Sequence, residues 1–202
     1  MTDRTSLPDV DLDSSTALIV VDVQNDFADP KGNLYVADGD RTIPLINDLT
    51  AAARRSGSLV VYTQDWHPEQ TPHFQPYGGT WPIHCVQGTW GAELHRDLHV
   101  EGDVIRKGVN GEDGYSGFAA HNVETGEEIS TGLRELLDER EIRRVVIVGL
   151  AEDVCVKETA LDARRLGYAT QVLLAATRPV NVEETDASTA QAAMRAAGVE
   201  LR

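Results

Sequence analysis

The chain has 202 residues, of which 41% are hydrophobic and 25% charged, so we expect a single globular domain spanning residues 1–202. Its 33 acidic and 18 basic residues give a net charge of −15, which argues against binding to nucleic acids or to anionic membranes, because both depend on Lys and Arg. Two cysteines are too few for a disulfide scaffold, no apolar run approaches the about 18 residues of a membrane helix, and the polar start of the chain lacks a signal-peptide core. We therefore expect a cytoplasmic protein with no nucleic-acid or membrane partner.

Short apolar runs alternate along the chain with stretches of helical periodicity. In chain order, we predict strand 17–23, helix 40–56, strands 58–63 and 103–108, helix 129–140, strand 143–151, helix 154–166, strand 169–176, helix 183–197 and strand 199–202. The strongest strands are continuous runs of Val, Ile and Leu, which is typical of parallel strands buried on both faces. The pattern predicts an α/β fold with three layers, in which a doubly wound, mostly parallel sheet lies between helices.

Residues 64–102 form a long connection with little periodicity. This connection contains five of the six histidines and half of the eight prolines. Long connections in small domains are usually functional or disordered, and disordered segments are poor in aromatic residues. Because this one is rich in aromatic residues, we expect an ordered functional loop.

Three residues of this loop could hold a metal ion. Asp65 follows a strand directly, and His67 projects to the same side two residues later. His84 returns from further along the chain and could complete a set of three ligands. Imidazole and carboxylate together suit Zn, Fe or Mn. The alternative is that these loop histidines make ordinary hydrogen bonds.

Asp22, Lys107 and Cys155 could carry nucleophilic chemistry. Each lies at or just after the end of a predicted strand, and in a parallel sheet these ends share one edge. Cys155 is expected in the first turn of a helix, where the helix dipole lowers a thiol pKa. Asp22 could take its proton, and Lys107 could balance the charges. The alternatives are a strand-end cap for Asp22, a lysine that reaches solvent, and an inert buried cysteine.

The chain resembles the nicotinamidases (pyrazinamidases) of the isochorismatase-like cysteine hydrolase family from about Ala17 to Thr177. The resemblance is carried by six motifs in the order of the family: VDVQNDF, DWHP, WPIHCVQGT, RKG, GYSGF and GLAEDVCVKETALDA. Each motif is weak alone, but all six in this order are highly specific.

The resemblance implies a role for each group of residues. Asp22, Lys107 and Cys155 match the catalytic triad of the family, and the backbone N–H groups of Ala151 and Cys155 match its oxyanion hole, with a cis peptide before Ala151. Further positions match the ligands of one divalent ion (Zn first, with Fe or Mn as alternatives) and the walls around the substrate ring. The metal ligands are Asp65, His67 and His84, joined in some members only by His73, and the walls are Phe27, Trp81 and Tyr115.

The implied reaction is hydrolysis of nicotinamide to nicotinate and ammonia through a cysteine thioester, with pyrazinamide as a second substrate, in NAD salvage. Family members often self-associate, which implies a homo-oligomer. The chain departs from the usual motif at Glu152 and Val154, where the family has a small hydroxyl residue and a ring. A related amidohydrolase acting on another small amide, such as a carbamoyl compound, and a non-catalytic metal-binding protein are the alternatives.

Overall fold

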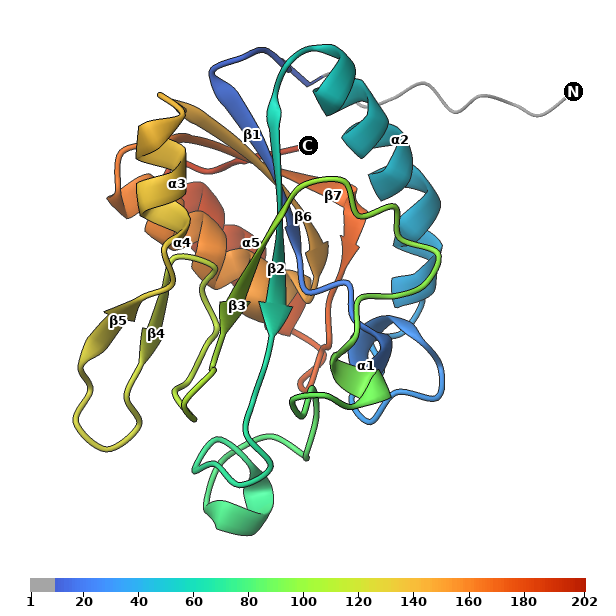
Figure 1. Ribbon diagram of the computed structural model, residues 1–202, viewed down its shortest axis with the longest axis vertical. Helices are drawn as coiled ribbons and strands as arrows, with labels where there is room; N and C mark the ends of the chain where they lie inside the picture. The colour runs from blue at the N-terminus through green and yellow to red at the C-terminus, as the bar shows by residue number, and fades with distance from the viewer. Residues whose placement is uncertain (1–9) are drawn as a thin grey trace, which may run out of the picture.

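A parallel six-stranded sheet forms the centre of the computed structural model, which describes residues 10–202 (Figure 1). The chain start at residues 1–9, where no signal peptide is expected, lies outside the described residues. The strand order is β3-β2-β1-β6-β7-β8, and every pairing in this sheet is parallel. The strands are β1 (Thr16–Val21), β2 (Leu59–Asp65), β3 (Asp103–Lys107), β6 (Arg144–Leu150), β7 (Ala169–Arg178) and β8 (Glu200–Leu201).

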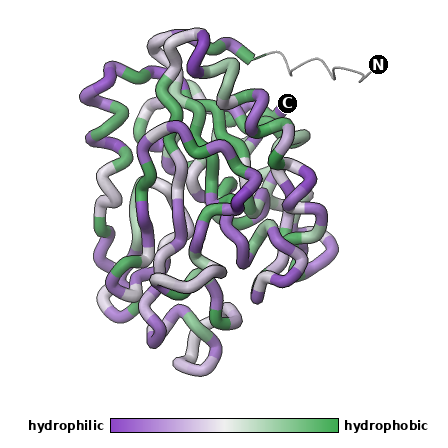
Figure 2. The backbone as a smooth tube through the Cα atoms, turned by 45° about the vertical axis from the view of Figure 1, so that its right-hand side comes forward, coloured by the Kyte–Doolittle hydropathy of each residue, from purple (hydrophilic) through white to green (hydrophobic). Residues whose placement is uncertain are grey.

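Two apolar layers enclose the sheet. Helix α2 (Ile43–Arg55) covers one face, and α3 (Leu133–Glu139), α4 (Lys157–Arg165) and α5 (Asp186–Ala196) cover the other (Figure 1). All six residues of β1 are buried because its two faces contribute side chains to different cores. Figure 2 shows the hydrophobic segments gathered on these central strands. The predicted fold class is confirmed.

Helix α2 follows its predicted periodicity. Ile43, Ile46, Leu49 and Ala53 are buried on one side, against the sheet. The chain turns back at Gly57, which has a left-handed φ of +79° just beyond the helix end. Short helical segments lie elsewhere on this side and in the loops: α1 (Asn25–Ala28), η1 (Gly39–Thr42), η2 (Gln75–Tyr77) and η3 (Trp90–Ala92). Within residues 10–202, every helix is too short or too polar to cross a membrane.

The region predicted as helix 129–140 begins with a strand instead. Residues Glu128–Ser130 form β5, which pairs antiparallel with β4 (Ala119–His121) in a small hairpin. Helix α3 starts only after Gly132, whose left-handed φ of +89° separates it from the hairpin. The hairpin strands have three residues each, which is too short for a two-residue periodicity to be recognised.

The strand order reverses between β1 and β6. The chain builds outward from β1 through β2 to β3, then crosses to β6 and builds outward through β7 to β8. Ligands of open α/β sheets bind at such a reversal, beyond the carboxyl ends of the strands. Asp22 follows β1, Asp65 and Lys107 end β2 and β3, and Cys155 follows β6. The topology therefore gathers these four residues at one site.

Gly149 allows β6 to pass close to β1 just before this site. Its φ is +108°, and a Cβ atom placed there would lie 2.2 Å from the carbonyl oxygen of Val21. We expect Gly149→Ala to lower the free energy of unfolding by more than about 2 kcal/mol, through strain and overlap. Gly57→Ala is the control, since it also has positive φ but nothing within 4 Å, and should cost about 1 kcal/mol. Urea unfolding of both variants measures this, and equal losses would contradict it.

Candidate active site

Lys107 forms the buried charged centre of the site. Its side chain is fully enclosed, and its Nζ lies 2.8 Å from Asp22 Oδ2. The same ammonium forms an ion pair with Asp65 Oδ1, donates to the carbonyl of Gly114, and lies 3.6 Å from Cys155 Sγ. Two carboxylates can be buried here because one cation lies between them.

The sheet and two neutral side chains fix this arrangement. Asp65 and Lys107 are register partners in the β2–β3 pairing. The Thr63 hydroxyl donates to Asp22 Oδ1 at 2.7 Å and accepts the Asp22 N–H at 3.2 Å. Gln24 bonds both the N–H and the carbonyl of Asp65, each at 2.8 Å. Sequence reasoning missed Thr63 and Gln24, because their partners lie 41 residues away along the chain.

The two carboxyl groups respond differently to their surroundings. Burial raises the pKa of Asp22 to about 6, although Lys107 opposes this. Burial also raises the pKa of Asp65, but Lys107 and the neighbouring rings of His67 and His84 outweigh it and hold that pKa well below its usual range. Burial lowers the pKa of Lys107, but the two carboxylates outweigh burial and keep the side chain charged. Asp22 is therefore the carboxylate better suited to accept a proton.

Cys155 lies in a wider turn than the predicted α-helical one. Residues Glu152–Val156 form a single turn of π-helix ahead of α4, with the N–H groups of Val154 and Val156 both bonded to the Ala151 carbonyl. The Leu150–Ala151 peptide is cis, as the resemblance implied. Burial raises the pKa of the Cys155 thiol well above its usual range, against the opposing charge of Lys107. The lowered thiol pKa expected from a helix start is therefore wrong, and the thiol needs a base.

Glu152 points away from the cavity. One carboxylate oxygen accepts from the Thr177 hydroxyl at 2.7 Å, and the other accepts from the Gln191 amide at 2.8 Å. The neighbouring Asp153 accepts the N–H groups of Val180 and Asn181. The acidic residues of this turn therefore bind the segments that follow it, and the negative charge of Glu152 is directed away from the Cys155 backbone.

Four side chains gather beside Lys107 as a possible ligand set for a cation. The side-chain nitrogens of His67, His73 and His84 lie within 4.8 Å of one another. Asp65 Oδ2 lies 3.7 Å from His67 Nε2 and 3.8 Å from His84 Nε2. Ligand atoms about 2.1 Å from a shared ion would be roughly 3–4 Å apart, so the separations of Asp65 from His67 and His84 fit one ion.

The hydrogen bonding and the pKa of these histidines also favour metal binding. Among residues 10–202, neither ring nitrogen of the buried His67 has a hydrogen-bond partner, which is costly unless something else binds them. Burial lowers the pKa of His67, which favours the neutral ring that a metal requires. Nδ1 of His84 lies 2.8 Å from the Pro82 carbonyl, so a proton there leaves Nε2 free to bind.

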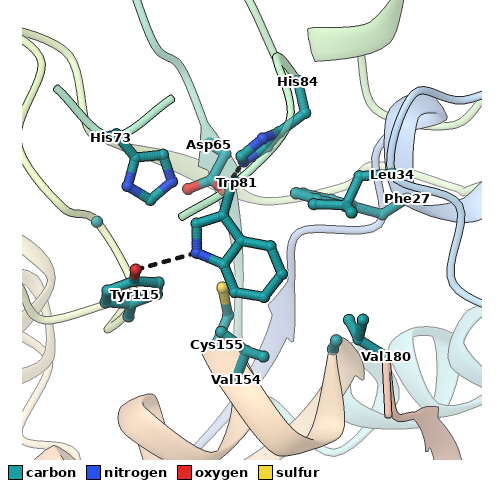
Figure 3. Close-up of a pocket in the computed structure, with 12 residues that line it drawn as sticks. Phe27, Leu34, Asp65, His73, Trp81, His84, Tyr115, Val154, Cys155 and Val180 are labelled. Atoms are coloured by element: carbon teal, nitrogen blue, oxygen red, sulfur yellow. Dashed lines mark hydrogen bonds and ion pairs between the residues drawn. The ribbon is translucent and has the colours of Figure 1, made fainter. Parts of the chain in front are cut away.

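A cavity opens between Cys155 and the histidines. Figure 3 shows the Cys155 sulfur directed into the same space as Trp81, Asp65 and His84. Phe27, Trp81 and Tyr115, the three predicted walls, all line the cavity, and the Trp81 indole donates to the Tyr115 hydroxyl at 3.0 Å. Residues that sequence reasoning did not assign to the walls also line it: Leu34, Gly114, Val154 and Val180.

The other cysteine and histidines lie outside the cavity lining. Cys85 packs in the core with its side chain fully buried, and its backbone N–H donates to Asp26 Oδ2 at 2.7 Å. His95 packs near Asp29 and Asp97, and His121 near Glu128. The His99 carbonyl accepts a hydrogen bond from Tyr62.

Residues 16–201 match a protein-family model described as "Isochorismatase domain". The chain belongs to the isochorismatase family. A relative in this family, the Escherichia coli (strain K12) nicotinamidase, is 37% identical over 203 residues, covering 92% of this chain and 93% of the relative. The resemblance drawn from the six sequence motifs is confirmed.

Solved structures in the same family agree with this fold. L. infantum PnC1 in complex with nicotinate is 40% identical, with a TM-score of 0.86 over 96% of this chain and 95% of that one. The pyrazinamidase of Pyrococcus horikoshii in complex with zinc is 36% identical, with a TM-score of 0.81 over 93% of this chain and 98% of that one.

Lys107 balances the charges of two buried carboxylates, so we expect it to be necessary for the stability of the folded chain. Lys107→Met would leave two buried carboxylates without their cation, so we expect a loss of about 3–5 kcal/mol in the free energy of unfolding. Lys31→Met is the matched control, because this lysine is exposed and should change stability by less than about 0.5 kcal/mol. Urea unfolding compares the two variants, and a Lys107 variant as stable as the control would disprove the pairing.

Proposed function

We propose that this chain hydrolyses nicotinamide to nicotinate and ammonia, and accepts pyrazinamide in the same way. The observation that carries the proposal is the cluster of Cys155, Asp22 and Lys107 at a cavity that also holds the histidine group. Further support comes from the nicotinamidase that is 37% identical and from the related structure that holds nicotinate.

Asp65, His67, His73 and His84 would hold one divalent ion, and we propose zinc, as in the Pyrococcus horikoshii pyrazinamidase. When bound, the ion supplies a Lewis acid that binds and polarises the pyridine nitrogen of the substrate. The ligand residues would thereby place the ring with its carboxamide toward Cys155. In this proposal the nucleophile is the cysteine sulfur and not a hydroxide.

Asp22 starts the reaction by accepting the proton of the Cys155 thiol. The Asp22 carboxylate and the sulfur lie within 4.8 Å of each other, and Lys107 contacts both. The sulfur then attacks the carboxamide carbon, while the ammonium of Lys107 offsets the negative charge that moves between the groups. The raised pKa of Asp22, about 6, makes it a stronger base than an exposed aspartate.

The tetrahedral intermediate collapses when Asp22 returns its proton to the amide nitrogen. The C–N bond breaks, ammonia leaves, and Cys155 is left as a thioester. A water molecule then gives a proton to Asp22 and attacks the thioester carbon as hydroxide. The C–S bond breaks, Asp22 returns the proton to the sulfur, and nicotinic acid and the free thiol result. The backbone N–H groups of Ala151 and Cys155 would stabilise the oxyanion of both steps.

The apolar walls would select a flat ring. Phe27, Trp81 and Tyr115 surround the space beside Cys155, and aromatic side chains pack well against the faces of a heteroaromatic ring. Val154 and Val180 narrow the cavity further with small branched groups. An aliphatic carbamoyl compound has neither a flat ring to pack against these walls nor a ring nitrogen to bind the metal.

We propose that this reaction serves NAD salvage in the cytoplasm. Both cysteines are free and buried, which is compatible with a reducing compartment. We also propose that the chain self-associates, as a homo-oligomer, which size-exclusion chromatography with light scattering would determine.

Ammonia release tests the function directly. The purified protein, loaded with zinc, is given nicotinamide, pyrazinamide or a carbamoyl amino acid, each with and without a chelator. We expect turnover of the two ring amides, its loss with chelator, and recovery when zinc is restored. Turnover of the carbamoyl compound alone would favour the related amidohydrolase, and no turnover of any amide would favour a binding protein.

Cys155→Ala separates the nucleophile from the metal site. Because the sulfur is not proposed as a ligand, this variant should lose turnover by at least about 10⁴-fold while its zinc content stays at the wild-type level. Cys85→Ser removes the other thiol and should keep most of the activity. Elemental analysis and the ammonia assay are run on both, and loss of zinc from Cys155→Ala would show that the roles are assigned wrongly.

His84→Ala should lower metal occupancy and substrate affinity together. The His84 ring is one of the proposed ligands, and without it we expect zinc to bind about 10–1,000-fold more weakly and the Michaelis constant for nicotinamide to rise. His99→Ala is the control, since this residue is exposed and its hydrogen bonds with Tyr62 and Asn47 use backbone atoms, which the substitution keeps. Full zinc occupancy in His84→Ala would exclude this histidine from the ligand set.

A further inference from the structure

His73 is joined to a carboxylate on a different loop. Nδ1 of His73 is hydrogen-bonded to Oδ1 of Asp113, which lies on the connection between β3 and β4. The histidine side chain is buried, whereas that of Asp113 is 32% exposed. If Nδ1 donates its proton to this carboxylate, the lone pair of the ring is on Nε2. His73 also stacks on His67, with ring centroids 4.6 Å apart, inside the histidine cluster.

A second contact aligns the same two loops. The Thr71 hydroxyl donates to the Gly111 carbonyl at 2.8 Å and accepts the His73 N–H at 3.2 Å. One threonine therefore connects the backbone beside Asp113 with the backbone of His73. The hydrogen bond between His73 and Asp113 therefore joins two segments whose backbones are already held together by Thr71.

The hairpin β4–β5 holds the loop of Asp113 from the other side. Asp113 and His121 exchange two backbone hydrogen bonds, both 2.9 Å long. Glu128, opposite His121 in the hairpin, forms an ion pair with Arg165 of α4 at 3.0 Å. The backbone of Asp113 is thus paired with the hairpin, and a surface ion pair connects the hairpin with a helix that packs on the central sheet.

We infer that Asp113 is a positioning residue that fixes the His73 ring as the fourth protein ligand of the metal site. This inference rests on the proposed function, because it concerns the ion held by the same cluster. Asp113 orients the ring and strengthens its Nε2 as a ligand, as carboxylates behind metal-bound histidines commonly do. The site then has one ligand whose ring orientation depends on the β3–β4 connection as well as on its own loop, 64–102.

Zinc affinity, measured by competition with a chromophoric chelator, tests this without any turnover. Asp113→Ala should bind zinc about 10–100-fold more weakly than the wild type. Asp113→Asn, which keeps the size of the side chain, should also weaken binding and guards against a folding defect. Glu124→Ala removes an exposed carboxylate from the hairpin turn and should leave zinc affinity within about twofold.

The decisive comparison uses His73→Ala with and without Asp113→Ala. If Asp113 acts through His73, adding its substitution to His73→Ala should change zinc affinity no further. Cobalt-loaded protein should show the same loss of one nitrogen ligand in the visible spectra of both single variants. Unchanged affinity in the Asp113 variants, or an equal further loss in the absence of His73, would overturn the inference.

The outcomes also separate this inference from the proposed function. A wild-type protein that hydrolyses nicotinamide while the Asp113 variants bind zinc normally would overturn only the role of Asp113. A protein that loses zinc affinity as expected but never hydrolyses nicotinamide would overturn only the function.

Discussion

One buried ammonium group determines the arrangement of this site. Lys107 contacts Asp22, Asp65 and the sulfur of Cys155, and the side chains of the first two carry charges that could not be buried without it. The register of β2 and β3 places Asp65 and Lys107 side by side. The pairing of these two strands therefore also sets the charge balance of the site. The charged groups of Asp22, Asp65 and Lys107 therefore hold the carboxyl ends of three strands together at the site.

The two carboxylates beside Lys107 differ in pKa. Burial raises the pKa of Asp22 to about 6, whereas Lys107 and two histidines overcome burial and keep Asp65 ionised. One group can therefore exchange a proton while the other stays available as a permanent ligand. The raised pKa of Cys155 keeps its thiol protonated, so the thiol needs a neighbouring base such as Asp22 before it can attack.

The sequence was sufficient to predict the main strands and to place Asp22, Lys107 and Cys155 at one sheet edge, since each lies at or shortly after the end of a predicted strand. It could not reveal the short hairpin, because three-residue strands leave no readable period. Nor could it find Gln24 or Asp113, whose partners lie 41 and 40 residues away and depend on how loops meet in space. The sequence also predicted an ordinary α-helical start where the structure has the π-helical turn, because the residues of this turn are typical of any helix start.

The bonds of Glu152 connect the turn of the cysteine with α5. Because its two oxygens are taken by Thr177 and Gln191, the departure from the usual family motif is not a local change. A smaller residue at position 152 would leave the half-buried Gln191 amide without this acceptor, and the Thr177 hydroxyl with the Leu174 carbonyl alone. Across evolution these three positions should be inherited as a set, so that relatives with a different residue at the first also differ at the other two.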